Sequence, residues 1–380
     1  MTRVSTPNPP SQFIPSNRPI LGAEEIDAVT QVLRTGMLTH KSGAGKFAVK
    51  FEKAFAKFIG AKHAIAVNSG TAALHAALLA LNVKPGDEVI APPFSFIATT
   101  NMILLCGAKV VFADIDPLTF NLDPEKVKSA ITSKTKAIMP VHLYGHPTEM
   151  DPLLELAQKH DLGIIEDSCQ AHGTRYRGRQ VGTIGDVGCF SLYPSKVITT
   201  GEGGMLTTNN DELAVILRRI RTHGEVQPYE FVRLGHNYRM PEIEAAIGVE
   251  QLKRLPGFLK QRRKNAKYLS KQLSEVEGIA LPHEADWATH NWYLYTIRVQ
   301  KPYKRDTVQK KLQEAKIGAA IYYEVPLHLT PIYRKLFNYK KGMMPVTEQA
   351  TQEVLSLPVH PALTDSELAW IAVQVSKSVK

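Results

Sequence analysis

Between residues 63 and 210, short apolar runs alternate with amphipathic stretches, and this pattern limits the possible folds more strongly than composition does. Runs rich in β-branched residues are typical of buried strands, and they occur at residues 63–67, 88–91, 110–113, 137–142 and 163–166. The stretches between them have helical periodicity. Strands that alternate with helices form a parallel sheet covered by helices on both faces, so the sequence predicts an α/β fold.

The pattern changes on both sides of this region. The first part of the chain contains five prolines without clear periodicity, so we expect an arm that is mobile or lies against another part of the protein. After residue 255, Pro256 and Gly257 interrupt a helical pattern, and a basic helix, a strand at 292–299 and a helix at 306–315 follow. We therefore expect an arm (1–19), a large domain (20–255) and a smaller α+β domain (256–380), with a ligand between the domains.

The chain has 380 residues, 44% of them hydrophobic and 22% charged, which is the composition of a folded globular protein. No apolar run approaches the roughly 18 residues that span a membrane. The polar, Pro-rich start does not resemble a secretory signal, so we expect a cytoplasmic protein with no membrane partner. Its three cysteines, Cys106, Cys169 and Cys189, are too widely spaced for a disulfide framework. The 13 histidines form no metal-binding motif, so no metal is expected.

The chain is basic, with 46 basic and 36 acidic residues and a net charge of +10. Part of the excess is a stripe of lysines at helical spacing: Lys260, Lys264, Lys267 and Lys271. Such a stripe is usually a solvated helix face, but it is also compatible with binding to nucleic acid. A phosphorylated small substrate would suit a basic protein as well. Charge by itself leaves these alternatives open.

The first candidate site is the segment 68–71, which joins a predicted strand to a predicted helix over residues 72–81. A helix N-terminus presents unpaired N–H groups and a positive dipole end. Gly70 lets the backbone approach an anion and Thr71 adds a hydroxyl, so we expect a phosphate here. The alternative is a simple helix cap, because the segment has neither a Walker A lysine nor a G-x-G-x-x-G pattern.

The second candidate is the acidic pair Glu166 and Asp167, at the end of the strand predicted at 163–166. Ligands of open α/β sheets bind beyond the carboxyl ends of the strands. Asp167 is therefore expected to point its carboxylate into the cleft, toward a cationic group. A helix cap or a buried ion pair is the structural alternative.

The third candidate is Lys196, which follows an apolar run and precedes a Gly-rich turn at residues 201–204. A lysine at the end of a strand can be partly desolvated, which lowers its pKa and makes the amine a nucleophile toward an aldehyde. An arbitrary lysine is a surface charge, but this context makes Lys196 a candidate for Schiff-base formation.

An anion cradle, a carboxylate for a pyridinium nitrogen and a lysine for an aldehyde are together what pyridoxal 5′-phosphate requires. With these residues the chain resembles the DegT/DnrJ/EryC1/StrS family, the sugar aminotransferases of fold type I, from about Pro19 to Pro361. The resemblance implies a mostly parallel seven-stranded sheet flanked by helices, followed by a small α+β domain. It rests on the motifs at residues 69–74, 166–170, 190–196, 201–204 and 235–240.

The resemblance also implies which residues contact the cofactor ring. Lys196 would form the Schiff base and then move a proton between the cofactor and the substrate carbon. Asp167 would keep the ring nitrogen protonated. Gln170 would contact the ring hydroxyl, and Phe96 would stack on the ring.

For the phosphate, the resemblance implies Gly70, Thr71 and Ser191, together with Asn237 from a neighbouring subunit. The active site is therefore expected to be complete only in a homodimer. Tyr323 and His328 match a family segment that faces the substrate, although both residue types are also common in packing. The chain departs from the family pattern at residues 39–43 and at Ser168-Cys169, which do not carry the chemistry directly.

The expected function is transfer of an amino group, from glutamate or glutamine, to a nucleotide-linked keto-sugar. A keto-cyclitol is an open alternative as acceptor. Relatives that act as sugar dehydratases carry His where this chain has Lys196, which disfavours that activity. The alternative from another class is a regulatory or DNA-binding protein without catalysis. The complete set of Lys196, Asp167 and Gln170 argues against it, so no nucleic-acid partner is expected.

Overall fold

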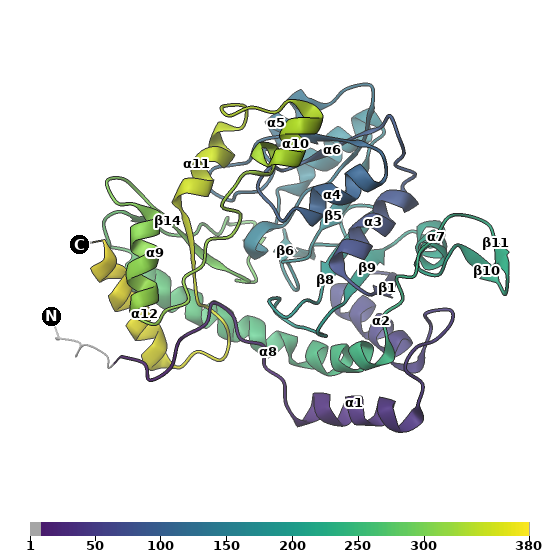
Figure 1. Ribbon diagram of the computed structural model, residues 1–380, viewed down its shortest axis with the longest axis horizontal. Helices are drawn as coiled ribbons and strands as arrows, with labels where there is room; N and C mark the ends of the chain where they lie inside the picture. The colour runs from purple at the N-terminus through teal and green to yellow at the C-terminus, as the bar shows by residue number, and fades with distance from the viewer. Residues whose placement is uncertain (1–8, 380) are drawn as a thin grey trace.

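A seven-stranded sheet lies at the centre of the computed structural model, which describes residues 9–379 (Figure 1). Its strands are β1 (His63–Val67), β2 (Glu88–Ala91), β3 (Lys109–Phe112), β4 (Thr135–Ile138), β5 (Gly163–Asp167), β8 (Val187–Ser191) and β9 (Gly204–Thr208). They lie in the order β1–β9–β8–β5–β4–β2–β3, and every neighbouring pair is parallel except those of β9 with β1 and β8. The predicted α/β fold with a mostly parallel seven-stranded sheet is confirmed.

Side chains of the sheet alternate between cores on its two faces. In β1, Ile65 and Val67 pack into one core, whereas Ala64 and Ala66 pack into the other. This alternation follows from the pleat of a strand and shows that both faces are covered. On the first face lie α3 (Gly70–Ala80), α4 (Ala98–Leu105) and α7 (Asp211–Arg221). On the second lie α2 (Lys46–Ile59), α5 (Pro124–Ala130), α6 (Met150–His160) and the first half of α8 (Glu242–Leu273).

One predicted strand extends further than the structure allows. The strand expected at 137–142 is β4, which ends at Ile138. The backbone N–H of Met139 still donates to the carbonyl of Ile90 at 2.8 Å, but Pro140 has no N–H to continue the ladder. The other four predicted strands agree with the structure to within one residue at each end.

Helix α8 is 32 residues long and connects two hydrophobic cores. Its first half contributes Val249 and Leu252 to a core beneath the large sheet, and its second half contributes Leu269 and Leu273 to a separate core. The helix continues through Pro256, so the interruption predicted there is wrong. A proline inside a helix costs about 3 kcal/mol. Burial of the apolar side chains on both sides of it offsets this cost.

The second core surrounds a small antiparallel sheet of β12 (Ile279–Ala280), β14 (Tyr295–Val299) and β15 (Val354–Leu357). The strand expected at 292–299 starts only at Tyr295, since Trp292 has a left-handed backbone conformation with φ of 56°. Helices α9 (Arg305–Glu314) and α12 (Asp365–Ser378) pack on this sheet, and α9 confirms the helix predicted at 306–315. The remaining elements include α1 (Ala23–Thr35), α10 (Pro331–Phe337), α11 (Pro345–Glu353), β6 (Arg175–Tyr176), β7 (Arg179–Gln180) and β13 (Ala288–Thr289).

The Pro-rich arm lies against the second core from residue 9 onward. Ile14 is buried there, and its backbone N–H donates to the carbonyl of Lys316 at 2.9 Å. The side chain of Asn17 accepts a hydrogen bond from the buried Arg262 at 2.8 Å. The expectation for residues 1–8 lies outside the described residues. Over the described part of the chain, no helix combines the length and the apolar character of a membrane span.

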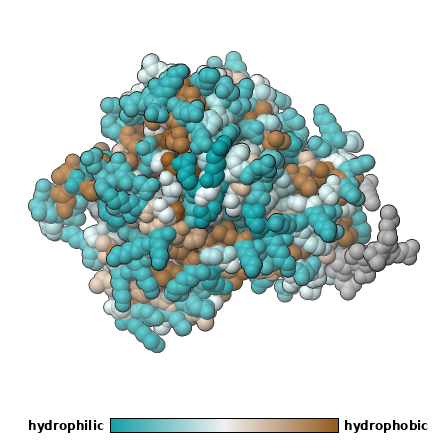
Figure 2. Space-filling view, turned by 180° about the vertical axis from the view of Figure 1, so that it is seen from behind, coloured by the Kyte–Doolittle hydropathy of each residue, from teal (hydrophilic) through white to brown (hydrophobic). Residues whose placement is uncertain are grey.

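A hairpin of β10 (Glu225–Gln227) and β11 (Glu230–Phe231) projects from the edge of the molecule beyond α7 (Figure 1). The turn of the hairpin and the residues after β11 carry large apolar side chains exposed to solvent: Tyr229 is 87% exposed and Leu234 is 90% exposed. Figure 2 shows hydrophobic residues at this protruding edge, seen from behind. The hairpin therefore presents an apolar surface that the described part of the chain leaves uncovered.

Candidate active site

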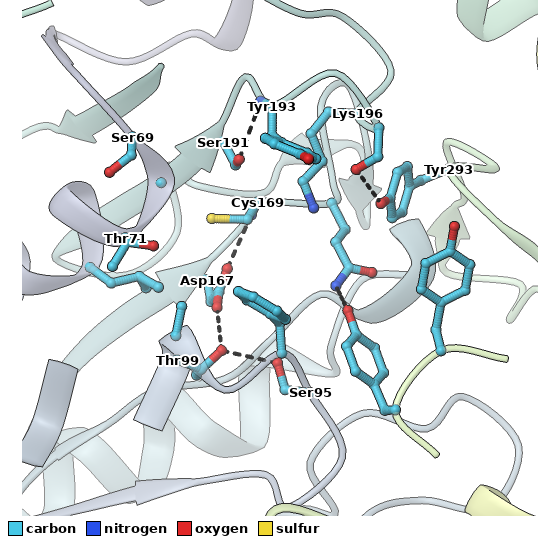
Figure 3. Close-up of a pocket in the computed structure, with 18 of the residues that line it drawn as sticks. Ser69, Thr71, Ser95, Thr99, Asp167, Cys169, Ser191, Tyr193, Lys196 and Tyr293 are labelled. Atoms are coloured by element: carbon cyan, nitrogen blue, oxygen red, sulfur yellow. Dashed lines mark hydrogen bonds between the residues drawn. The ribbon is translucent and has the colours of Figure 1, made fainter. Parts of the chain in front are cut away.

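A cavity of about 490 Å³ opens at the carboxyl ends of β5 and β8, where ligands bind in open α/β sheets. In Figure 3, Ser69 and Thr71 lie on one side of this active-site cavity and Tyr293 on the other, while Lys196 reaches into the middle. The cavity brings together eight of the ten site residues expected from the sequence: Gly70, Thr71, Phe96, Asp167, Gln170, Ser191, Lys196 and Tyr323.

The N-terminus of α3 forms one wall of the cavity. Ser69 caps the helix, since its Oγ accepts a hydrogen bond at 3.0 Å from a backbone N–H of the first turn. At Gly70 a Cβ atom would lie 2.7 Å from the Cβ of Ser191 and 3.0 Å from the Sγ of Cys169. Only glycine lets the start of α3 approach Ser191 and Cys169 this closely. The first N–H groups of α3 and the hydroxyls of Thr71 and Ser191 therefore form a cradle for an anion.

The carboxylate of Asp167 is fixed at the end of β5. Its Oδ2 accepts a hydrogen bond from the hydroxyl of Thr99 at 2.8 Å, and its Oδ1 accepts one from the backbone N–H of Cys169 at 3.2 Å. Thr99 in turn is 3.0 Å from the hydroxyl of Ser95. The carboxylate is buried yet lines the cavity, so a bound cation would meet a negative charge of fixed orientation.

The neighbouring carboxylate, Glu166, has a structural role. It is fully buried, accepts hydrogen bonds from three backbone N–H groups in the loop 182–185, and lies 3.0 Å from the Nε2 of His142. Burial by itself would raise the pKa of Glu166, but His142 and these N–H groups lower it below its ordinary value. Successive side chains of a strand point to opposite faces, so only Asp167 of the acidic pair faces the cavity.

Gln170 is held at both ends of its amide. Its Oε1 accepts a hydrogen bond from the backbone N–H of Tyr144 at 2.8 Å, and its Nε2 donates to the hydroxyl of Tyr323 at 2.8 Å. The rings of Tyr144 and Tyr323 are stacked, with centroids 6.1 Å apart. Burial raises the pKa of both hydroxyls well above the ordinary value, so both remain protonated. Gln170 and Tyr323 therefore form one rigid wall.

The amine of Lys196 lies beside an aromatic ring: its Nζ is 4.9 Å from the ring centroid of Tyr293. Burial lowers the pKa of Lys196, but Tyr293, Cys169 and Asp167 raise it, and the net shift is upward. The expectation of a lowered pKa is therefore wrong, because the neighbours outweigh desolvation. When Lys196 is not bound to an aldehyde, its side chain is therefore in the ammonium form. It must lose a proton before the amine can attack an aldehyde.

Several cavity residues have no part in the sequence-based expectations, among them Thr99 and Tyr293. Thr99 lies in the segment that follows β2, so the rule on strand ends that identified Asp167 also points to this segment. Tyr293 gives no such signal, because it reaches the cavity from a region that precedes β14, far along the chain.

Two of the ten expected site residues lie outside the cavity. Asn237 is exposed, and its backbone carbonyl accepts a hydrogen bond from the side chain of Asn68 at 3.4 Å. The side chain of His328 is buried, with its Nε2 3.1 Å from a carboxylate oxygen of Glu348 and its ring packed against Phe112. The structure thus places His328 in packing and Asn237 on the surface.

The cavity fits pyridoxal 5′-phosphate in three respects. The first N–H groups of α3 and the hydroxyls of Thr71 and Ser191 line one side of the cavity and can bind a phosphate, and Asp167 provides a carboxylate for a pyridinium nitrogen. Lys196 provides an amine for the aldehyde. Phe96, 60% exposed at the cavity, offers a ring face for stacking.

Comparison with known proteins agrees with this fit. Residues 19–376 match the DegT/DnrJ/EryC1/StrS aminotransferase family. The chain is 42% identical over 356 residues to the GDP-perosamine synthase of Caulobacter vibrioides, covering 92% of this chain and 94% of that protein. DesV of S. venezuelae, solved with a ketimine intermediate, matches with a TM-score of 0.90 and 37% identity over 94% of this chain and 95% of that chain. The PLP form of Spr1654, a putative sugar aminotransferase from Streptococcus pneumoniae, matches with a TM-score of 0.90 and 28% identity. The match covers 97% of this chain and 98% of that chain.

These similarities show that the fold is that of fold type I aminotransferases and that the chain is a sugar aminotransferase with pyridoxal 5′-phosphate as its cofactor. The match extends over nearly the whole length of the chain and includes the residues that build the cavity. The chain belongs to the DegT/DnrJ/EryC1/StrS aminotransferase family.

Proposed function

We propose that the chain transfers an amino group from glutamate or glutamine to a nucleotide-linked keto-sugar. The observation that carries this proposal is that Lys196, Asp167 and the N-terminus of α3 line the same cavity. Bound pyridoxal 5′-phosphate supplies an aldehyde that condenses with amines and a ring that withdraws electrons from the substrate carbon. The amino donor and the keto acceptor would use the cavity in turn.

Within this proposal, the chain's own residues hold the cofactor and move protons. Asp167, fixed by Thr99, holds a proton on the ring nitrogen. The N-terminus of α3 and the hydroxyl of Ser191 bind the phosphate. In its neutral amine form, Lys196 would accept a proton from the substrate carbon and then donate it again on the cofactor side of that bond, which suits an amine that reaches the middle of the cavity. Gln170, whose amide is fixed at both ends, contacts the ring hydroxyl.

Two observations support a nucleotide-linked acceptor. A protein that shares 42% of the aligned residues is named GDP-perosamine synthase. The net charge of +10 also suits a substrate that carries a diphosphate, because a basic protein attracts anionic ligands. A keto-cyclitol is the alternative acceptor.

The acceptor is tested with a panel of nucleotide-linked keto-sugars and keto-cyclitols, incubated with cofactor-loaded protein and either glutamate or glutamine. Mass spectrometry should detect a nucleotide sugar in which an amino group has replaced the keto oxygen. Amination of cyclitols alone would assign the other acceptor class. If no acceptor is aminated, the proposed transfer is wrong, and salt-sensitive DNA binding without cofactor absorbance would support the regulatory alternative.

We also propose that two copies form a dimer with shared active sites. Exposed apolar side chains clustered on one surface mark an interaction site, and the hairpin of β10 and β11 carries such a cluster. Asn237 lies six residues beyond β11 and is itself exposed. A two-fold axis beside this surface would cover both hairpins and bring the Asn237 of each copy to the phosphate cradle of the other.

A further inference from the structure

We propose that Tyr293 is a positioning residue for Lys196: its ring face holds the ammonium form of the lysine and so keeps the amine in the cavity whenever it is not coupled to the cofactor. The inference rests on the proposed function of Lys196. It goes beyond that function because it assigns a role to Tyr293, which lies just before β14 of the small sheet.

The geometry between the two side chains is that of a cation beside an aromatic face. The Nζ of Lys196 lies 4.9 Å from the ring centroid of Tyr293, within the roughly 6 Å over which such pairs attract. The ring is 5% exposed, so little water competes for the ammonium group. The hydroxyl of Tyr293 is also 3.2 Å from the hydroxyl of Ser195. Tyr293 therefore contacts both Lys196 and the residue before it.

The backbone of Tyr293 is anchored to the loop that follows Asp167. Its N–H donates to the Oδ1 of Asn291 at 2.8 Å, and the Nδ2 of Asn291 donates to the carbonyl of Gln170 at 2.9 Å. Its carbonyl accepts a hydrogen bond from the buried Arg262 at 3.1 Å. The place of the ring is thus set by the same loop that carries the cofactor-binding residue Gln170.

A glycine makes room for this anchor. A Cβ at Gly145 would lie 1.7 Å from the Oδ1 of Asn291, and the residue has a φ of +98°. Only glycine satisfies both conditions without displacing Asn291. The carbonyl of Gly145 also accepts a hydrogen bond from the backbone N–H of Asn291 at 3.1 Å. The tight packing at this position holds the side chain of Asn291, which in turn anchors the backbone of Tyr293.

Two roles for the ring predict opposite effects of its removal. A ring that only excludes water disfavours the ammonium form, so its loss would raise the pKa of Lys196. A ring that binds the ammonium form favours it, so its loss would lower that pKa. The direction of the change therefore distinguishes the positioning role from a merely structural one.

The experiment uses the full chain loaded with pyridoxamine 5′-phosphate, in which Lys196 is not coupled to the cofactor. The protein is acetylated with acetic anhydride at a series of pH values, and mass spectrometry of the peptide that contains Lys196 gives the pH midpoint of its reactivity. For Tyr293→Leu and Tyr293→Met we expect this midpoint to fall by about half to one pH unit, as loss of a cation–π contact implies. Tyr293→Phe, which keeps the ring but loses the hydroxyl, should lower the midpoint clearly less than the Leu and Met variants, because the hydroxyl also favours the ammonium form.

The matched control is Tyr295→Leu. Tyr295 is a fully buried ring two residues further along the chain, and its hydroxyl is 2.9 Å from Ser270, outside the cavity. This variant should lower the melting temperature without moving the midpoint of Lys196. Two ring-deleting variants of Tyr293 are used so that the result does not depend on the folding of one.

An unchanged or raised midpoint in the folded Leu or Met variant would overturn the inference, as would a Phe variant that shifts like them. Failure of the proposed function is recognised separately. If wild-type protein loaded with pyridoxal 5′-phosphate and reduced with borohydride carries no label on Lys196, the role of the lysine itself is wrong. A label on Lys196 with no effect of Tyr293 contradicts this inference alone.

Discussion

The hydroxyl of Thr99 donates a hydrogen bond of 2.8 Å to the carboxylate of Asp167, and this bond connects the first turn of α4 to the end of β5. Thr99 is fully enclosed, with 1% of its surface exposed. In the proposed function this carboxylate faces the ring nitrogen of the cofactor, and the hydrogen bond fixes its orientation before the cofactor binds. Residues that fix a charge in this way contribute to catalysis without touching the substrate.

Replacing Thr99 with Val should therefore reduce catalysis. Loss of a hydrogen bond to a charged group is worth about 1.5–3 kcal/mol, so we expect kcat/KM to fall about ten- to hundredfold. The matched control is Thr100→Val, since Thr100 is equally buried but bonds to Ile97 and Tyr333 away from the cavity. Equal losses in both variants would show that the effect comes from α4 in general.

Replacing Asp167 with Asn removes the charge that, in the proposed function, holds the proton on the ring nitrogen of the cofactor. The expected fall in kcat is about 10²–10³-fold, as for other groups that stabilise charge in the transition state, with a small change in melting temperature. Glu166→Gln should show the reverse pattern, because it disrupts a buried contact with His142 and the loop 182–185. Near-normal turnover in Asp167→Asn would leave Asp167 with only a structural role.

Borohydride reduction should attach the cofactor covalently to Lys196, and peptide mapping measures the site of attachment. Lys196→Ala should lose both this label and transamination while still binding the cofactor through the phosphate cradle. Lys253→Ala, which removes an exposed lysine on α8, should behave as wild type. A label on any other lysine would contradict the assignment.

The shared active site is tested by complementation. Lys196→Ala and Asn237→Asp chains should each be inactive, the second because a carboxylate would repel the phosphate. Mixed dimers contain one site with both native residues, so random exchange should restore up to about a quarter of full activity, since half of the dimers are mixed and each has one intact site. No recovery after demonstrated exchange would place Asn237 in the site of its own chain.

Glu244 gives a prediction on pH and stability. Burial and the nearby Glu202 raise the pKa of Glu244 from 4.5 to about 7. Between these values the folded chain binds more protons than the unfolded chain, so the contribution of this group to stability is present at low pH and is lost as the pH rises through 7. Glu244→Gln should therefore raise the free energy of unfolding at pH 8 by about 1 kcal/mol, after allowing for solvent screening at this half-buried position. The measurement is the melting temperature, which should rise accordingly.

The gain from Glu244→Gln should be clearly smaller at pH 5, where the folded chain already holds the proton. Glu250→Gln is the control on the same helix, because Glu250 is paired with Lys253. It should not raise stability at pH 8. A gain that is independent of pH would show that titration of Glu244 is not its cause.

Much of the site was predictable because its residues follow the strands of one sheet. Asp167 ends β5 and Gly70 begins the helix after β1, so local patterns and the rule on strand ends place them together, whereas Ser191 at the end of β8 was expected only from the resemblance to the family. Tyr293 was not predictable in this way. Its position depends on a contact with Arg262 and, through the neighbouring Asn291, on a contact with Gln170, which the chain brings together only by packing distant segments.

Two errors have a related physical reason. The pKa of Lys196 was expected to fall because a local pattern reveals desolvation but not the neighbours that oppose it. Pro256 was expected to interrupt a helix because its local effect is unfavourable, whereas tertiary burial on both sides maintains α8. In both cases interactions distant in sequence outweigh the local preference.

The continuity of α8 has a consequence for how the molecule unfolds. One helix supplies apolar side chains to two cores, so melting of either core would fray the helix and expose the residues that it contributes to the other. The free energies of the two halves are therefore coupled. We expect heat to unfold the chain in a single cooperative transition, and amide hydrogen exchange in the central turns of α8 to be as slow as in the large sheet.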